Sequence, residues 1–147
     1  MRRIRNKVFE TNSSSSHSIV IGNGENDDVV LPIKVIPIWQ QGFGWEWDVW
    51  NSIEEKIAYM VRALIIYDYH DEDSLKEKIK PIQSKLHSIG IDFDMPTYEE
   101  FENGYLDHPE YYHDEIEYIY NDNELLLKFL LNEDSYVRGG NDNEPED

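Results

Sequence analysis

The element that decides the fold is predicted over residues 52–69, SIEEKIAYMVRALIIYDY. Ser52 and Glu55 have the spacing of a capping box, in which each side chain accepts a hydrogen bond from the backbone N–H of the other residue. The apolar residues that follow recur every three or four positions, as on one face of an α-helix: Ile53, Ile57, Met60, Val61, Leu64 and Ile65. This helix should therefore bury a broad apolar face.

A second helix is predicted over residues 74–89, with Ser74 and Glu77 as its capping box and Gly90 as the residue that ends it. Pro81 should kink or split it, because proline removes a helical hydrogen bond. The short loop between the two helices favours antiparallel neighbours that together cover one face of a sheet.

The remaining elements are shorter. Strands are predicted over residues 2–9, 18–21, 91–95 and 115–120, with extended edge segments over residues 29–38. A short helical turn is predicted over residues 97–101, and the apolar residues 125–131 should be buried as a helix or as a last core strand. We therefore expect one α+β domain over residues 1–138, with a mostly antiparallel sheet and two longer helices packed on one face. A flexible acidic tail is expected over residues 139–147.

Composition excludes several classes of protein. The chain has 147 residues, no cysteine, and 31 acidic against 13 basic residues, for a net charge of −18. The missing cysteine excludes disulfides and thiolate metal sites, and the charge repels nucleic acid and anionic membranes. No apolar run approaches the roughly 20 residues of a membrane helix, and the first residues lack the apolar core of a signal peptide. A cytoplasmic protein is expected.

The acidic residues are unevenly distributed. No lysine or arginine lies between Lys85 and Lys128, whereas that interval holds twelve Asp and Glu residues and several tyrosines. It is either a solvated acidic face or a surface for a basic partner, in which Glu115 and Glu117, on one strand face, imitate a phosphate backbone. All four tryptophans lie in residues 39–50, and two of them are partner-binding candidates. The full set of candidates is Asp92, Asp94, Glu99, Glu102, Glu110, Tyr111, Tyr112, Glu115, Glu117, Tyr118, Trp45 and Trp47.

A polar stretch, FETNSSSSHS over residues 9–18, carries the candidate nucleophiles. A serine hydroxyl needs a neighbouring base, and that base needs an orienting carboxylate. If the protein is an enzyme, the candidates are Ser14, Ser15 and His17, with Asp107 and His108 as an acid–base pair. A polar binding loop and a purely structural loop remain open alternatives.

Metal binding has only a weak signal. His108 and His113 lie near Asp107, Glu110 and Asp114, but the two histidines do not have the i, i+4 spacing of helical metal ligands. We therefore predict no metal site and no cofactor, with these two histidines as the weak candidates.

The polar stretch, together with GFGW at residues 42–45, YLDH at 105–108 and the segment 132–143 that contains GGND, resembles a family of small bacteriophage proteins from Gram-positive hosts. That family has no established activity, so the resemblance implies a phage origin and no residue roles. By analogy with other small acidic phage proteins, the expected function is to bind and inhibit a basic host protein. The target would be a nucleic-acid-handling or defence factor in the host cytoplasm, with no direct binding to nucleic acid or membrane. The alternative is a small enzyme or ligand-binding protein for a nucleotide or a protein, which would require these segments to converge in the fold.

Overall fold

The computed structural model describes residues 16–23 and 29–140. Its helices are α2 (Ile53–Ile65), α3 (Glu72–Ser88), α4 (Tyr98–Asn103), α5 (His113–Tyr120) and α6 (Asn123–Leu131), with a 3₁₀ helix η1 (Pro109–Tyr111). Its strands are β1 (Ser16–Val20), β2 (Ile33–Val35), β3 (Gly42–Phe43), β4 (Asp48–Trp50), β5 (Ile91–Phe93), β6 (Tyr105–Leu106) and β7 (Tyr136–Gly140). The predicted α+β class is confirmed.

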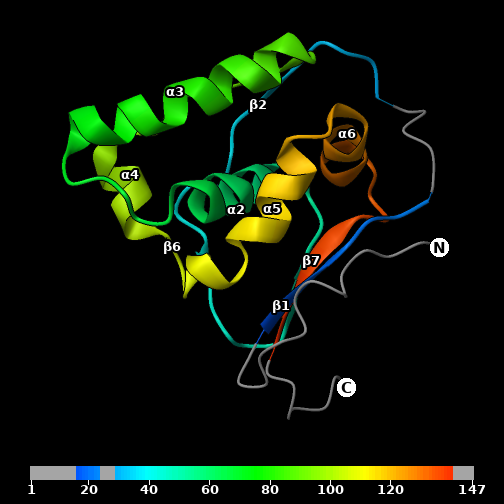
Figure 1. Ribbon diagram of the computed structural model, residues 1–147, viewed down its shortest axis with the longest axis horizontal. Coiled ribbons are helices and arrows are strands. Elements are labelled where there is room, and N and C mark those ends of the chain that lie inside the picture. The colour runs from blue at the N-terminus through cyan, green and yellow to red at the C-terminus, as the bar shows by residue number, and fades with distance from the viewer. Residues whose placement is uncertain (1–15, 24–28, 141–147) are drawn as a thin grey trace.

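The largest sheet is antiparallel, with β7 between β1 and β4. Gly139 of β7 lies opposite both His17 of β1 and Asp48 of β4. Two further pairs are parallel, β2 with β5 and β3 with β6. Figure 1 shows α3 and the antiparallel sheet at opposite ends of the molecule, with α2 between them. The first helix is thus central, whereas the second packs on α2 and on β5.

Helix α2 is the centre of the core. The predicted capping box at Ser52 and Glu55 is present, and every residue from Lys56 to Ala63 is buried. The helix ends at Ile65 because Ile66 and Tyr67 adopt left-handed backbone conformations, with φ of 47° and 58°. It is therefore four residues shorter than predicted.

Two buried cations connect α2 to distant segments. Lys56 Nζ donates hydrogen bonds to the carbonyl oxygens of Asn132 and Ser135, after α6. Arg62 donates to the carbonyl oxygens of Trp39 and Phe101, and its guanidinium lies 3.9 Å from the centre of the Phe101 ring. These bonds connect segments before β3, in α4 and after α6 to the central helix.

The predicted start of the second helix needs correction. Helix α3 begins at Glu72, with Asp71 and Ser74 as its capping box, so Ser74 is the third residue of the first turn and not the N-cap. The helix then continues through Pro81 to Ser88 without splitting. The box predicted for the 97–101 turn is present, with Thr97 as N-cap of α4.

Residues 115–120 form part of helix α5, which contradicts the predicted strand. Ile116 and Ile119 are both buried and lie three residues apart, as on one helix face, whereas Tyr118 between them is exposed. Glu115 is buried and Glu117 is exposed, so these carboxylates do not share a face as predicted.

The structure also decides the predictions for two further segments. Residues 125–131 lie in α6, which selects the helix from the two predicted alternatives. Gly139 and Gly140, predicted in the flexible tail, belong to β7 and pair with β1. The predicted strand over residues 2–9 and the tail after Gly140 lie outside the described residues.

Candidate functional site

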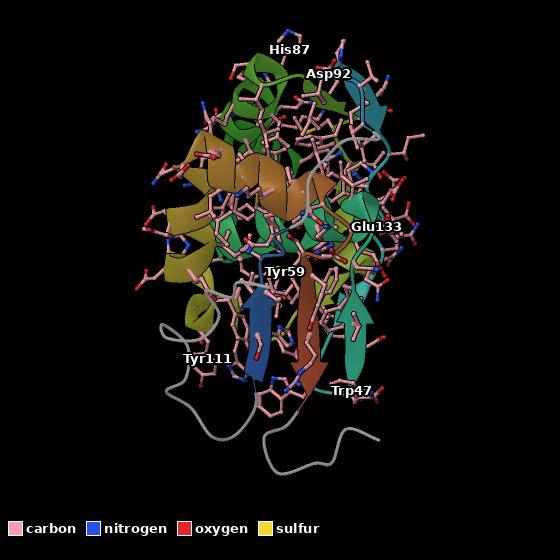
Figure 2. The ribbon with its side chains drawn as sticks, turned by 90° about the vertical axis from the view of Figure 1, so that its right-hand side faces the viewer. Trp47, Tyr59, His87, Asp92, Tyr111 and Glu133 are labelled. Atoms are coloured by element: carbon pink, nitrogen blue, oxygen red, sulfur yellow. The ribbon has the colours of Figure 1, made fainter. Side chains whose placement is uncertain are left out.

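Segments far apart in the sequence meet at the end of the molecule that carries the antiparallel sheet, here called the strand end and comprising β1, β3, β4, β6, β7 and η1. Strand β3 pairs with β6, and His17 of β1 contacts Gly44, directly after β3. Figure 2 shows Trp47 and Tyr111 at this end, far from His87 and Asp92. Described parts of the segments 9–18, 42–45, 105–108 and 132–143 therefore converge here.

His17 lies at the centre of this convergence and is completely buried. Its Nε2 is 2.7 Å from the carbonyl oxygen of Gly44, which can only accept, so Nε2 carries the hydrogen. Nδ1 therefore accepts from the hydroxyl of Tyr59, at 3.0 Å. Burial lowers the pKa of His17 to about 4, although the bond to Gly44 opposes this shift. His17 is thus a neutral structural residue and not the accessible base that the sequence suggested.

Aromatic rings enclose the His17 imidazole. The Tyr112 ring stacks on it at 4.6 Å between centroids, and the Trp50 ring meets it edge-on at 5.3 Å. Phe43 packs edge-on against both Trp50 and Tyr59. Tyr112 is only 2% exposed, so it belongs to this cluster and is unavailable to a partner, contrary to prediction. Buried Glu115 is unavailable for the same reason.

An open cavity of about 240 Å³ is lined in part by Gly44 and Trp50, which both contact His17. We call it the acidic cavity; its lining residues are Gly42, Gly44, Trp45, Glu46, Asp48, Trp50, Tyr105 and Asp107. Three of the eight are carboxylates and three are aromatic, and none is a lysine or arginine. No salt bridge within the described part of the chain involves Glu46, Asp48 or Asp107. The cavity therefore offers negative charge that the described residues do not neutralise.

A close approach of Tyr105 to β3 shapes the wall of this cavity. A Cβ atom on Gly42 would lie 2.3 Å from the Tyr105 ring, so only glycine allows the ring to lie against the strand. At Gly44 the nearest atoms are the Tyr105 hydroxyl, at 3.3 Å from such a Cβ, and a carboxylate oxygen of Asp107, at 3.6 Å. Gly42 thus leaves room for the Tyr105 ring, and Gly44 lies close to both Tyr105 and Asp107.

Three exposed rings form a stack beside the cavity. The His108 imidazole lies between Trp45 and Tyr111, with centroid distances of 5.2 and 5.0 Å and interplanar angles of 22° and 13°. His108 has a left-handed backbone with φ of 51°, and its Nδ1 is 3.5 Å from a carboxylate oxygen of Glu110. Trp45 and Tyr111 remain 38% and 42% exposed, so the stack presents apolar surface next to the carboxylates.

The other predicted partner residues do not form one surface. Asp92 pairs with His87 and Asp94 with Lys34, at the end opposite Tyr111. The Glu102 carboxylate accepts from the Tyr69 hydroxyl. Trp47 lies under the Arg138 guanidinium, 5.1 Å from the ring centre, whereas Glu99, Glu117 and Tyr118 are exposed on α4 and α5. The acidic residues of this interval therefore lie at both ends of the molecule and do not make a single face.

The remaining candidates are separated. Ser14 and Ser15 lie outside the described residues. Asp107 lines the acidic cavity, whereas neighbouring His108 belongs to the stack. His113 donates from Nδ1 to the Ala63 carbonyl oxygen, so the two weak metal candidates have different surroundings. Sequence reasoning missed Glu46 and Asp48, whose available signal was their position beside Trp47 and the two glycines of residues 42–44.

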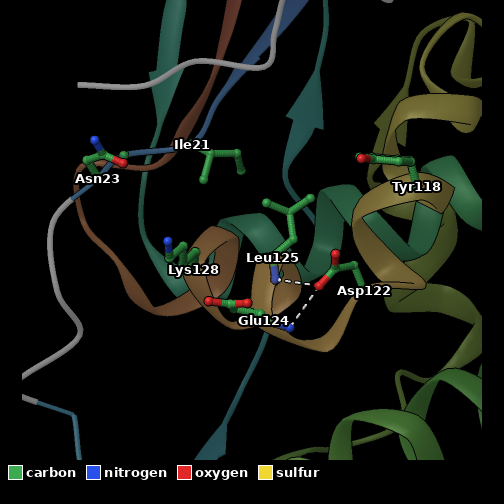
Figure 3. Close-up of a pocket in the computed structure, with 8 residues that line it drawn as sticks. Ile21, Asn23, Tyr118, Asp122, Glu124, Leu125 and Lys128 are labelled. Carbon is green, nitrogen blue, oxygen red and sulfur yellow. Dashed lines mark hydrogen bonds between the residues drawn. The ribbon is translucent and has the colours of Figure 1, made fainter.

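A second cavity, of about 260 Å³, lies beside α6 (Figure 3). Its lining combines Ile21 and Leu125 with Tyr118, Lys128 and Asp122. The Asp122 carboxylate already accepts from the backbone N–H groups of Glu124 and Leu125, as the N-cap of α6. Because its lining combines a lysine with carboxylates, this cavity is a less selective site for a cation than the acidic cavity.

Comparison with known proteins finds no matching family model, no matching curated protein and no matching solved structure. Across the residues that the structure describes, no helix has the length and apolar character to span a membrane.

Proposed function

We propose that this chain is a binding protein that captures a basic segment of another protein in the acidic cavity. The observation that carries the proposal is the lining itself: Glu46, Asp48 and Asp107 meet three aromatic side chains with no basic residue among them. Carboxylates form charge-assisted hydrogen bonds with guanidinium and ammonium groups, and aromatic faces attract the same cations. An arginine or lysine side chain fits both features.

The neighbouring stack supplies apolar contact area for the rest of the segment. Trp45 and Tyr111 are partly exposed and held parallel through His108, so little side-chain freedom is lost when a partner covers them. Tryptophan and tyrosine are the residues that interfaces favour for this reason. Cavity and stack share Trp45, which makes them one continuous binding surface.

Overall charge supports a basic partner. A net charge of −18 accelerates encounter with positive surfaces and repels nucleic acid. The phage resemblance extends the proposal to a host target: a protein whose basic surface normally contacts nucleic acid, or a defence factor, would be inhibited when that surface is occupied.

The geometry gives less support to the enzyme alternative. Nucleophilic catalysis by a serine needs an imidazole that can reach both the hydroxyl and the substrate. The imidazole of His17 is enclosed, both of its nitrogens are hydrogen-bonded, and its pKa is about 4. A general base near neutral pH needs a higher pKa and access to the reacting group.

The test is peptide binding measured by calorimetry at low and at moderate salt. Peptides of equal length that carry arginine, lysine or neutral residues are titrated into the wild type and into a Glu46→Gln/Asp48→Asn/Asp107→Asn variant. We expect the arginine and lysine peptides to bind, and the variant to bind them at least tenfold more weakly, about 1.4 kcal/mol.

A matched control separates the cavity from bulk charge. The variant Glu72→Gln/Asp73→Asn/Glu77→Gln removes the same charge from exposed positions of α3. Under the proposal it changes affinity only slightly. Equal losses in both triple variants would mean that only net charge matters, and absence of peptide binding to the wild type would refute the proposal.

A further inference from the structure

We infer that His113, Asp114 and Glu117 form a binding site for a divalent transition-metal ion at the start of α5. One possible ligand atom from each residue lies within 4.8 Å of the other two. Within the described parts of the chain, this is the one group of three or more such side chains with that spacing. The site is separate from the acidic cavity and does not depend on the proposed function.

The orientation of His113 is the strongest argument. Its Nδ1 lies 2.8 Å from the carbonyl oxygen of Ala63, which can only accept, so Nδ1 carries the hydrogen. In the neutral imidazole the lone pair is then on Nε2, which faces a Glu117 carboxylate oxygen at 3.8 Å. Metal-binding histidines characteristically donate their other N–H to a carbonyl or carboxylate, which fixes the ring and the tautomer.

The carbonyl that fixes the ring belongs to the buried core. Ala63 is a fully buried residue of the central helix α2, and α5 packs directly on that helix. His113 itself is only partly exposed. The imidazole is therefore held before any ion arrives, whereas the exposed carboxylates of Asp114 and Glu117 can adjust to it.

Spacing and distances agree with chelation. His113 and Glu117 are four residues apart, so their side chains share one face of α5. Their 3.8 Å separation is too long for a hydrogen bond, and a metal bonded to both at about 2.0–2.2 Å requires ligand atoms only slightly closer. Small rotations of the exposed Asp114 and Glu117 side chains would close the site, and three protein ligands would leave positions for water.

The ligand types select the ion. An imidazole with two carboxylates suits Zn²⁺, Co²⁺ or Ni²⁺, whereas Mg²⁺ and Ca²⁺ prefer oxygen ligands alone. The partial positive charge at the start of α5 opposes a cation, but two full carboxylate charges outweigh it. Two other histidines lie near carboxylates, His70 with Asp71 and His87 with Asp92; among the residues that the structure describes neither pair has a third ligand, so both provide internal controls.

The test is a titration of the full chain with Zn²⁺ alone as ligand, in a large excess of Mg²⁺ that occupies non-specific carboxylates. Calorimetry gives the stoichiometry, and imidazole ¹⁵N resonances of the five histidines identify the ligand. We expect saturation at one equivalent, with a large shift at Nε2 of His113 and at no other imidazole nitrogen.

Two matched variants complete the design. Glu117→Gln keeps the bond from His113 to Ala63, so it should fold normally and bind Zn²⁺ at least tenfold more weakly. Asp92→Asn removes the same charge beside His87 and should leave binding unchanged. Unchanged affinity in Glu117→Gln, or equal shifts at His87 and His113, would show adventitious binding only and overturn the inference. Because the readouts need no peptide, failure here leaves the proposed function untouched.

Discussion

The two ends of the molecule carry acidic residues in different electrostatic surroundings. At the end that carries α3 and β5, several acids have basic neighbours: Asp94 with Lys34, Glu72 with Lys76 and Asp68 with Lys78. At the strand end, the three carboxylates of the acidic cavity have no salt bridge within the described residues. Acid content alone therefore does not mark a binding surface, because an acid that is already paired has less charge to offer a partner.

The histidines show the same contrast between a buried role and an exposed one. His17 is enclosed at the strand end with both nitrogens hydrogen-bonded, whereas His87 is exposed at the opposite end. We expect His17→Ala to lower the free energy of unfolding by roughly 3–4 kcal/mol, because it creates a cavity and leaves Tyr59 and Gly44 without their partners. His87→Ala should change it by less than about 0.5 kcal/mol. Urea unfolding followed by tryptophan fluorescence measures both.

If His17→Ala does not fold, a milder variant tests the same structural role of His17. Tyr59→Phe keeps the ring and removes only the hydroxyl that donates to Nδ1 of His17. It should cost about 1–2 kcal/mol. Losses below about 0.5 kcal/mol in both variants would contradict a structural role for the buried histidine.

Acid should weaken the strand end through His17. Its pKa in the folded protein, about 4, lies below the ordinary value of 6.5, so the unfolded chain binds the proton first as the pH falls. Stability from this group is full above about pH 6.5 and is lost between about pH 6.5 and 4, by up to about 3 kcal/mol. The free energy of unfolding should be measured for the wild type and for His17→Asn at pH 7 and at pH 4.5. We expect the two proteins to differ less in this free energy at pH 4.5. An imidazole NMR titration of His17 with a midpoint near 6.5 would contradict this prediction.

The glycine pair offers a test of how the acidic cavity is shaped. Gly42→Ala would place a methyl group 2.3 Å from the Tyr105 ring and should cost about 1–3 kcal/mol and weaken peptide binding. Gly44→Ala, whose nearest contact would be 3.3 Å from the Tyr105 hydroxyl, should cost less. In a Tyr105→Ala background the penalty of Gly42→Ala should largely disappear. A penalty that persists there would mean that another contact, and not Tyr105, requires glycine.

Local signals in the sequence predicted the starts of two helices correctly. The capping boxes at Ser52 and Thr97 and the α+β class are confirmed, because capping depends on residues only three positions apart. The strand prediction for residues 115–120 was wrong because six residues of alternating type are compatible with either a strand or a short helix. Packing of Ile116 and Ile119 on the core selects the helix, and that packing involves distant segments.

The site was harder to predict because its contacts are long-range. The polar segments were suggested to share a site, and their described parts do converge. The burial and hydrogen bonding of His17, however, depend on Tyr59 and Gly44, which are 42 and 27 residues away. Pairing of Asp94 with Lys34 likewise joins residues 60 positions apart, so the sequence could not separate neutralised acids from the exposed charge of the cavity. The phage resemblance and the host target stay predictions.

The smallest expected effect has the most diagnostic sign. Asp94→Asn removes one partner of an exposed ion pair and should lower the free energy of unfolding by at most about 0.5 kcal/mol. Asp107→Asn removes one of three like charges that line the same cavity, so it should raise that free energy by a few tenths of a kcal/mol. Both effects should fade in 1 M salt, where the screening length falls to about 3 Å. Opposite signs at low salt would mean that the cavity retains a repulsion that a bound cation can relieve. Equal losses in the two variants would instead mean that Asp107 is neutralised like Asp94, and the contrast between the two ends would disappear.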